Sequence, residues 1–270
     1  MYAGTTIGNR SGSILGVHQR IDRIARQQLT PLLKDDAKFP NITQILYFEG
    51  NNGPDGIKRK SPSADEPWHF INPKNLDDRS LLDLISDHQK NLAKALKTGN
   101  QERASFEAAW LAHAVVDGLT PAHHYPLADK IHELFGKPHY ERLTVREKNV
   151  IRGKGWRDTV SKNWEYWGGG GVFSNHTFFE FGVATVILWR SFKKPVITKR
   201  DLNLIKDQGY EALFMRTLHQ VVALKTYETF QTKGWSADLS RTVKNELTPL
   251  IIKAVALSWY GSVLESEAKK

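Results

Sequence analysis

Cysteine is absent from this 270-residue chain. Disulfide bonds are therefore excluded, and so are metal sites built on thiolates. A tightly bound metal ion would have to use histidine, carboxylate or backbone groups, and the ten histidines supply enough imidazoles for such a site.

Long apolar runs and alternating apolar patterns are also scarce. Within the first 30 residues the main apolar stretch covers only residues 14–17, which is far shorter than the core of a signal peptide or a membrane span. We therefore expect no transmembrane segment, and a cytoplasmic protein as the sequence is written, or a secreted one if an upstream leader precedes it. The lack of strand-like alternation predicts an all-α fold.

The composition is that of a globular protein, with 40% hydrophobic and 25% charged residues. A chain of this length can bury one core, so we expect a single domain over residues 1–270. Lys and Arg outnumber Asp and Glu by 38 to 29, which gives a formal charge of +9. This balance favours anionic partners such as phosphates, nucleic acids or acidic lipids, although solubility alone would also explain it. The densest basic run, residues 58–60, is too short for a nucleic-acid footprint.

Helical periodicity divides the chain into a single-domain bundle of six or seven helices. Apolar residues at helical spacing predict helices over residues 14–33, 80–96, 101–116, 175–189, 202–232 and 239–264, with a kink at Pro249. Two segments lack this periodicity. Residues 34–75 are predicted to form a long loop, and residues 125–175 a loop insertion that contains four consecutive glycines.

The strongest chemical motif is His113-x3-Asp117-x5-His123. Residues four apart lie on one face of a helix, so His113 and Asp117 can point at the same ion. Gly118 and Pro121 then end the helix and can bring His123 back to it. A buried histidine or aspartate is often only a hydrogen-bonded core group, but a carboxylate on an otherwise apolar helix needs a cation or several donors.

A second motif, His176-x3-Glu180, repeats the same spacing in an aromatic setting. Such a pair on a helix can equally be an exposed hydrogen-bonded pair. It gains weight from the first motif, because imidazole and carboxylate groups together are typical zinc ligands.

Together the two motifs resemble the zinc-dependent phospholipase C and single-strand nuclease superfamily, whose signature is His-x3-Asp-x5-His followed by His-x3-Glu. The resemblance covers nearly the whole chain and extends upstream to His18, Asp55 and His69, and downstream to Trp259 on the last helix. It implies an all-α bundle that holds a zinc cluster in a cleft.

The resemblance also implies the ligands of up to three zinc ions. The first ion would be held by Asp55, His69, His113 and Asp117. The second would be held by His123, His176 and Glu180. The third would be held by His18 and by Asp117 as a bridging carboxylate.

Two ligands have open alternatives. The family completes its third site with an N-terminal Trp, whereas this chain begins with Met1 and Tyr2. We therefore expect two or three ions, the third held by the Met1 amine or a water, and His18 is otherwise an ordinary helix residue. Glu49 lies in the same predicted loop as Asp55 and could replace it as a ligand.

The implied activity is hydrolysis of a phosphate ester by metal-activated water, with Asp55 as the general base. We expect the phospholipase C type, because residues 117–123 resemble bacterial lipases of this group. A single-strand nuclease or nucleotidase is the alternative within the superfamily, and a non-catalytic, metal-stabilised phosphate-binding domain is the alternative outside it. The family's choline-binding lipases carry an aromatic residue after the loop Asp, and Gly56 at that position disfavours choline.

The expected partner is thus a phosphate-ester substrate, a phospholipid before a nucleic acid, and no obligate protein partner is implied. Four aromatic residues near the predicted site could contact lipid or stack on bases: Trp68, Phe70, Tyr125 and Phe173. We place five histidines outside the site: His88, His124, His132, His139 and His219.

Overall fold

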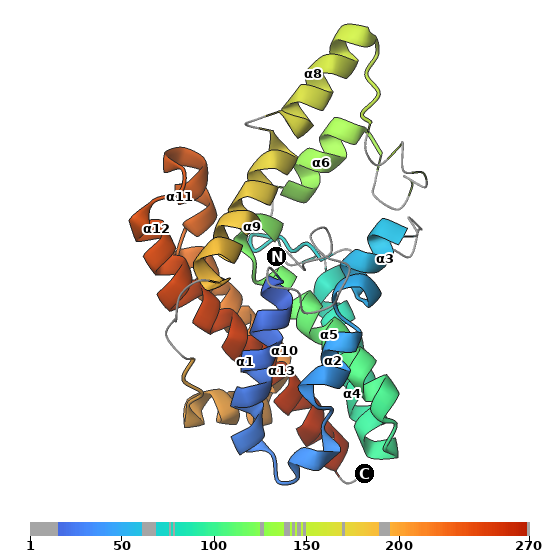
Figure 1. Cartoon of the computed structure of the whole chain (residues 1–270), viewed down its shortest axis with the longest axis vertical. Helices are drawn as coiled ribbons and strands as arrows, with labels where there is room; N and C mark the ends of the chain where they lie inside the picture. Colours follow the sequence, from blue (N-terminus) through green and yellow to red (C-terminus); the bar gives the residue numbers. More distant parts are fainter. Residues whose placement is uncertain are drawn as a thin grey trace.

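The fold is all-α, as predicted. The computed structural model describes residues 16–60, 69–75, 77, 79–124, 127–137, 141, 144, 147, 150–168, 171–188 and 195–268. Within these ranges every regular element is a helix (Figure 1), and one isolated bridge joins Ile71 to His124.

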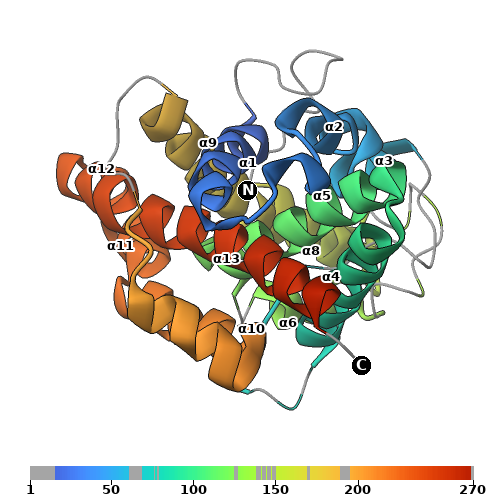
Figure 2. The same ribbon diagram turned by 90° about the horizontal axis from the view of Figure 1, so that it is seen from below.

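The helix α13 (Thr248–Glu267) lies at the centre of the bundle. It packs against α1 (Val17–Leu29), α4 (Ser80–Thr98), α5 (Gln101–Gly118) and α10 (Lys199–Ala223), and it crosses the bundle diagonally in Figure 2. Trp259 on α13 is fully buried and donates its indole N–H to the Ala108 carbonyl at 2.9 Å. Helix α13 is thus hydrogen-bonded directly to α5.

A π-helical turn over Val243–Leu247 joins α12 (Ala237–Thr242) to α13. The kink predicted at Pro249 takes this form, because proline has no N–H to donate to the preceding turn. The Val243 carbonyl accepts both the backbone N–H of Thr248 and its hydroxyl, the latter at 2.8 Å. The combined segment Ala237–Glu267 is long and apolar enough to cross a membrane, but its most apolar window is 67% buried, as expected for the core helix of a bundle.

The hairpin of α4 and α5 confirms the helices predicted at 80–96 and 101–116. Gly99 ends α4 in the left-handed conformation, with φ at 70°, and the Asn100 side chain accepts the Arg103 N–H at 3.0 Å to begin α5. At the other end of α5, a Cβ on Gly118 would lie 2.5 Å from Leu81 Cδ2. Glycine at this position therefore lets the helix approach its neighbour closely.

The long loop predicted at residues 34–75 is wrong in part. It contains α2 (Ile42–Tyr47), α3 (Pro54–Lys60) and short 3-10 turns. These helices are too short to show apolar periodicity and depend on their first residues: Asn41 forms a capping box with Gln44, and proline begins α3. The helix predicted at 202–232 is likewise divided, since Lys225 has a positive φ of 50° between α10 and α11 (Thr226–Lys233).

The loop insertion predicted at residues 125–175 is also largely helical, so the bundle has more helices than the six or seven expected. It holds α6 (Leu127–Phe135), α8 (Trp156–Trp167) and the start of α9 (Val172–Leu188). A separate apolar cluster of Leu134, Ile151 and Tyr166 forms there. These residues are too widely spaced for local periodicity to reveal. The described residues between 127 and 168, named the α6–α8 lobe here, project from one end of the bundle (Figure 1).

Candidate metal centre

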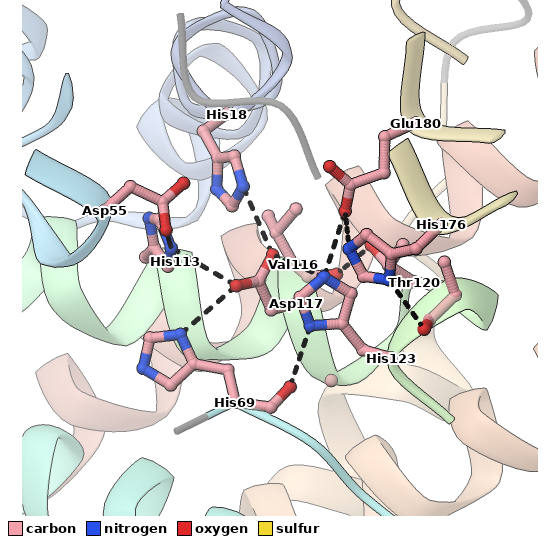
Figure 3. A network of polar contacts seen from close by, with 12 residues as sticks. His18, Asp55, His69, His113, Val116, Asp117, Thr120, His123, His176 and Glu180 are labelled. Carbon is pink, nitrogen blue, oxygen red and sulfur yellow. Dashed lines mark hydrogen bonds and ion pairs between the residues drawn. The ribbon is translucent and has the colours of Figure 1, made fainter. Parts of the chain in front are cut away.

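The eight side chains predicted as metal ligands lie together where five parts of the chain meet (Figure 3). They come from α1, α3, the segment before α4, the end of α5 with the short 3-10 helix η4 (Pro121–His123), and α9. In chain order they are His18, Asp55, His69, His113, Asp117, His123, His176 and Glu180.

Helix α5 supplies the centre of the cluster. Its last eight residues, 111–118, are all buried, and His113 and Asp117 lie there among Ala, Leu and Val side chains. The Thr120 hydroxyl donates to the Val116 carbonyl at 2.7 Å where the helix ends. The chain then turns through η4, which returns His123 to the same place, as the glycine and proline in the sequence predicted.

One oxygen of Asp117 faces two imidazoles. Asp117 Oδ2 lies 3.2 Å from His69 Nδ1 and 3.2 Å from His113 Nε2. His113 Nε2 is in turn 3.7 Å from Asp55 Oδ1. These four groups are the set predicted for the first ion.

The other oxygen of Asp117 faces two different imidazoles. Asp117 Oδ1 lies 3.3 Å from His18 Nε2 and 3.8 Å from His123 Nε2. A carboxylate whose two oxygens point at separate groups of imidazoles has the geometry of a bridging ligand. His18 therefore faces the cluster and is fully buried, which differs from an ordinary helix residue.

A second group forms around Glu180. Its Oε1 lies 3.0 Å from His123 Nε2 and 3.0 Å from His176 Nε2. One potential ligand atom from each of these residues lies within 4.8 Å of the others, and the same holds for His18, His113 and Asp117. The chain thus contains two buried or partly buried His, Asp and Glu groups that could hold a metal ion.

The spacing of these atoms suits zinc. Ligand atoms at about 2.1 Å from a tetrahedral ion are about 3.4 Å from one another. The nitrogen-to-oxygen separations in both groups run from 3.0 Å to 3.8 Å. The donors are all nitrogen and oxygen, a set that zinc accepts readily.

Three of the imidazoles are oriented by their second nitrogen. His113 Nδ1 lies 2.9 Å from Glu49 Oε1, His123 Nδ1 lies 3.0 Å from the His69 carbonyl, and His176 Nδ1 lies 3.1 Å from the Ala122 carbonyl. Each Nδ1 is thereby the donor, which leaves the Nε2 lone pair directed into the cluster. Outer hydrogen bonds of this kind are typical of metal-binding histidines.

Glu49 and Asp55 occupy opposite sides of His113. Glu49 contacts Nδ1 and is fully buried, whereas Asp55 is nearest to Nε2, the atom that faces Asp117. The Asp55 side chain is also 30% exposed while that of His113 is 0% exposed. Glu49 thus has the position of an outer partner, and Asp55 stands at the solvent side of the cluster.

Charges within the cluster stabilise one another. Burial alone would raise the pKa of Asp117, but nearby positive charges, the imidazoles of His123 and His113 among them, hold that pKa well below its usual range. Burial would likewise raise the pKa of Glu180, and nearby positive charges that include His176 and His123 lower it well below normal. For His113, burial opposes the charged form, and Glu49 and Asp117 nevertheless raise its pKa well above normal. The cluster is therefore built to balance positive charge against carboxylates.

Sequence reasoning did not find Asp22 or the role of Phe70. Asp22 lies one turn after His18, is 1% exposed, and has no hydrogen-bond partner for either carboxylate oxygen among the described residues. Burial raises its pKa well above normal, and Glu49 adds to the rise. Phe70 stacks on the His123 ring at 4.9 Å. The spacing of His18 and Asp22 was a signal that could have revealed the first of these.

The remaining histidines do not join the cluster where they are described. His88 pairs through Nδ1 with Glu107 at 2.6 Å. His124 donates to the Gly118 carbonyl at 3.1 Å, and burial lowers its pKa to about 4. His132 and His219 are exposed. Several predicted groups lie outside the described residues or have side chains that are not described: Met1, Trp68, Tyr125, His139 and Phe173.

Comparisons of the chain with protein-family models, with curated proteins and with solved structures found no match. The resemblance to zinc-dependent phospholipases C and nucleases thus rests on the motifs alone. The structure shows in addition that the described residues form an all-helical fold with buried histidine and aspartate clusters that could bind metal.

Proposed function

We propose that this protein is a zinc-dependent phosphoesterase that hydrolyses phosphate esters. The observation that carries the proposal is the position of Asp117, whose Oδ1 and Oδ2 face different imidazoles at 3.2 to 3.8 Å. A carboxylate shared in this way would hold two ions a few ångströms apart. Such pairs of ions are used in the hydrolysis of phosphate esters.

The chain provides ligands for two ions, and His18 adds a group for a third. The first set is Asp55, His69, His113 and Asp117, and the second is His123, His176 and Glu180. Zinc bound there would lower the pKa of water and neutralise phosphate oxygens as charge develops. Hydrogen bonds made by the Nδ1 atoms fix the imidazole rings of His113, His123 and His176, so that these ligands are already oriented for the ions.

Asp55 is our choice for the proton acceptor. It has 30% side-chain exposure, against 2% for Asp117 and 14% for Glu180, so among these carboxylates it is the one most open to water and substrate. It lies in the first turn of α3. A carboxylate at the edge of a metal cluster can take a proton from an attacking water.

We favour a phospholipid substrate over a nucleic acid, and one without choline. A Cβ at Gly56 would lie 2.3 Å from the Asn51 carbonyl oxygen, so the backbone leaves no room there for the aromatic residue that the choline-binding relatives carry. The formal charge of +9 suits an anionic phosphate ester. The ligand set itself is common to lipases and nucleases.

The experiment compares wild type with Asp55→Asn, using zinc-loaded protein and a chromogenic phosphodiester. If Asp55 is chiefly a proton acceptor, turnover should fall about a hundredfold or more while bound zinc changes little. Asp83→Asn is the matched control, because Asp83 is an exposed aspartate on α4 that pairs with Arg79.

Equal turnover in wild type and Asp55→Asn would show that Asp55 takes no part in the reaction. If Asp55→Asn loses bound zinc and turnover together, Asp55 is a metal ligand. If zinc-loaded wild type turns over no lipid, nucleotide or chromogenic ester, the metal-stabilised phosphate-binding domain replaces the enzyme.

A further inference from the structure

Helix α8 carries a row of exposed apolar side chains on one face. Trp156, Val160, Trp164 and Trp167 recur at helical spacing, and they are 72%, 60%, 74% and 39% exposed. These four residues are called the tryptophan ridge here. Large apolar groups at such exposure in consecutive turns differ from the single apolar residues scattered over most protein surfaces.

An adjacent face of α8 packs against the rest of the lobe. Tyr166 packs with Leu134 and Ile151 in the small core of the α6–α8 lobe. Asn163 Oδ1 accepts the Ile151 N–H at 3.2 Å, and Asn163 Nδ2 donates to the Ile151 carbonyl at 2.7 Å. The helix is therefore held in place, and the ridge faces outward. From typical side-chain areas, the ridge exposes roughly 500 Å² of apolar surface, a size at which the largest apolar patch of a protein is often functional.

Three cations lie at the start of α8 or in the four residues before it: Arg152, Lys154 and Arg157. None of them forms an ion pair within the part of the chain that the structure describes, and Arg157 lies 5.4 Å from the centre of the Trp156 ring. The two carboxylates of α8 are already neutralised, since Asp158 is 3.8 Å from Lys162 and Glu165 is 2.8 Å from Lys130. The end of α8 at which the ridge begins thus carries cations that form no ion pair within the described residues.

The lobe also lies beside the candidate metal centre. Helix α8 is followed within a few residues by α9, which carries His176 and Glu180. Phe70, which stacks on His123, packs against the small core of the lobe. A surface bound by the ridge would therefore lie near the proposed active site, at the projecting end of the molecule (Figure 1).

We propose that the tryptophan ridge docks this protein onto the surface of an anionic phospholipid bilayer. Tryptophan prefers the membrane interface, where its ring meets the acyl boundary and its N–H stays near the headgroups. Cations beside it add attraction to anionic lipid. The inference deepens the proposed function by naming a bilayer as the form of the substrate, but docking itself needs no turnover.

The test measures sedimentation of the full-length, zinc-loaded protein with vesicles of phosphatidylcholine and phosphatidylserine, and with vesicles of phosphatidylcholine alone. Wild type should bind the anionic vesicles, and Trp156→Ala with Trp164→Ala should weaken binding at least about tenfold. Tyr47→Ala is the matched control, because Tyr47 is an aromatic residue that is 63% exposed on α2, outside the lobe. It should bind as wild type does.

A second arm separates charge from apolar contact. Arg152→Gln, Lys154→Gln and Arg157→Gln should each weaken binding to anionic vesicles about fivefold, and salt should weaken wild-type binding. Turnover of a soluble chromogenic ester should be unchanged in the ridge variant, so loss of docking and loss of catalysis are read separately.

Three results would overturn the docking proposal. The first is that wild type does not sediment with anionic vesicles, and the second is that the double tryptophan variant binds as tightly as wild type. In a third result, wild type would be a dimer that the same double substitution converts to monomers, which would make the ridge a contact between two copies of the chain.

Discussion

The sharpest test of the metal centre is a substitution that leaves every predicted ligand in place. Glu49 is fully buried and contacts His113 Nδ1 at 2.9 Å, on the side away from Asp117. Glu49→Gln keeps a carbonyl oxygen that can accept the same hydrogen bond and removes only the charge. If His113 binds zinc through Nε2, the ring becomes a weaker and less firmly oriented ligand.

The expected loss follows from the outer position of Glu49. Removal of such a partner lowers metal affinity by about 10- to 100-fold, or about 1.4 to 2.7 kcal/mol. The effect should fall on the ion held by His113 and Asp117. The ion held by His176 and Glu180 should change little, because its imidazoles are oriented by the backbone carbonyls of His69 and Ala122.

The assay is competition for zinc between the protein and a chromophoric chelator. The matched control is Glu107→Gln, since Glu107 is also fully buried and contacts the Nδ1 of a histidine, His88, at 2.6 Å. His88 lies outside the cluster. Glu107→Gln should therefore lower thermal stability, by about 1 to 3 kcal/mol, without changing zinc affinity.

Equal zinc affinity in Glu49→Gln and wild type would refute this reasoning. So would an equal loss in the two variants, because the effect would then come from general destabilisation and not from His113.

Three further results are expected. Chelation of metal should lower the melting temperature markedly, because buried carboxylates and imidazoles would lose their shared cations; calorimetry with and without chelator measures this, and an unchanged curve after confirmed metal loss would contradict it. Gly118→Ala should lower the melting temperature, since its Cβ would lie 2.5 Å from Leu81 Cδ2, whereas Gly155→Ala, with nothing within 4 Å, should not. Burial alone would raise the pKa of Asp201, but hydrogen bonds from Thr198 and the nearby Lys253 and Arg216 hold it below normal. The contribution of the Asp201 carboxylate to the free energy of unfolding is present above the unfolded pKa of about 3.9, and it is lost as pH falls through the folded pKa. The stability difference between wild type and Asp201→Asn, in urea unfolding of metal-free protein, should therefore be about 1 kcal/mol near neutral pH and shrink as pH falls below about 4; a difference that does not change with pH would contradict it.

Local sequence patterns predicted the long helices and one face of the metal cluster. The i, i+4 spacing of His113 and Asp117 places both on one side of α5 in any helix, and the hairpin of α4 and α5 is specified by Gly99 and Asn100 at its turn. These signals involve residues that are close together in the sequence. They can therefore be interpreted without knowledge of the rest of the fold.

The features that the sequence did not reveal depend on distant contacts. The Tyr166 face of α8 is buried only because Leu134 and Ile151, from other segments, pack against it. The apolar pattern of α8 alone was therefore interpreted as irregular. The role of Glu49 is similar, since its position relative to Asp55 depends on which nitrogen of His113 each one meets. Spacing along the chain cannot decide that.

The central claim is that Asp117 is shared between two ions, and zinc titration of metal-free protein tests it most directly. Wild type should bind at least two zinc ions per chain. Glu180→Gln should weaken one of them, because Glu180 belongs to the second group alone. Asp117→Asn should weaken two ions, the one held with His113 and the one held with His18, because Asp117 Oδ2 and Oδ1 face these two imidazoles separately. If Asp117→Asn loses only one ion, as Glu180→Gln is expected to do, or if wild type binds no zinc, Asp117 is not a bridge and the account fails.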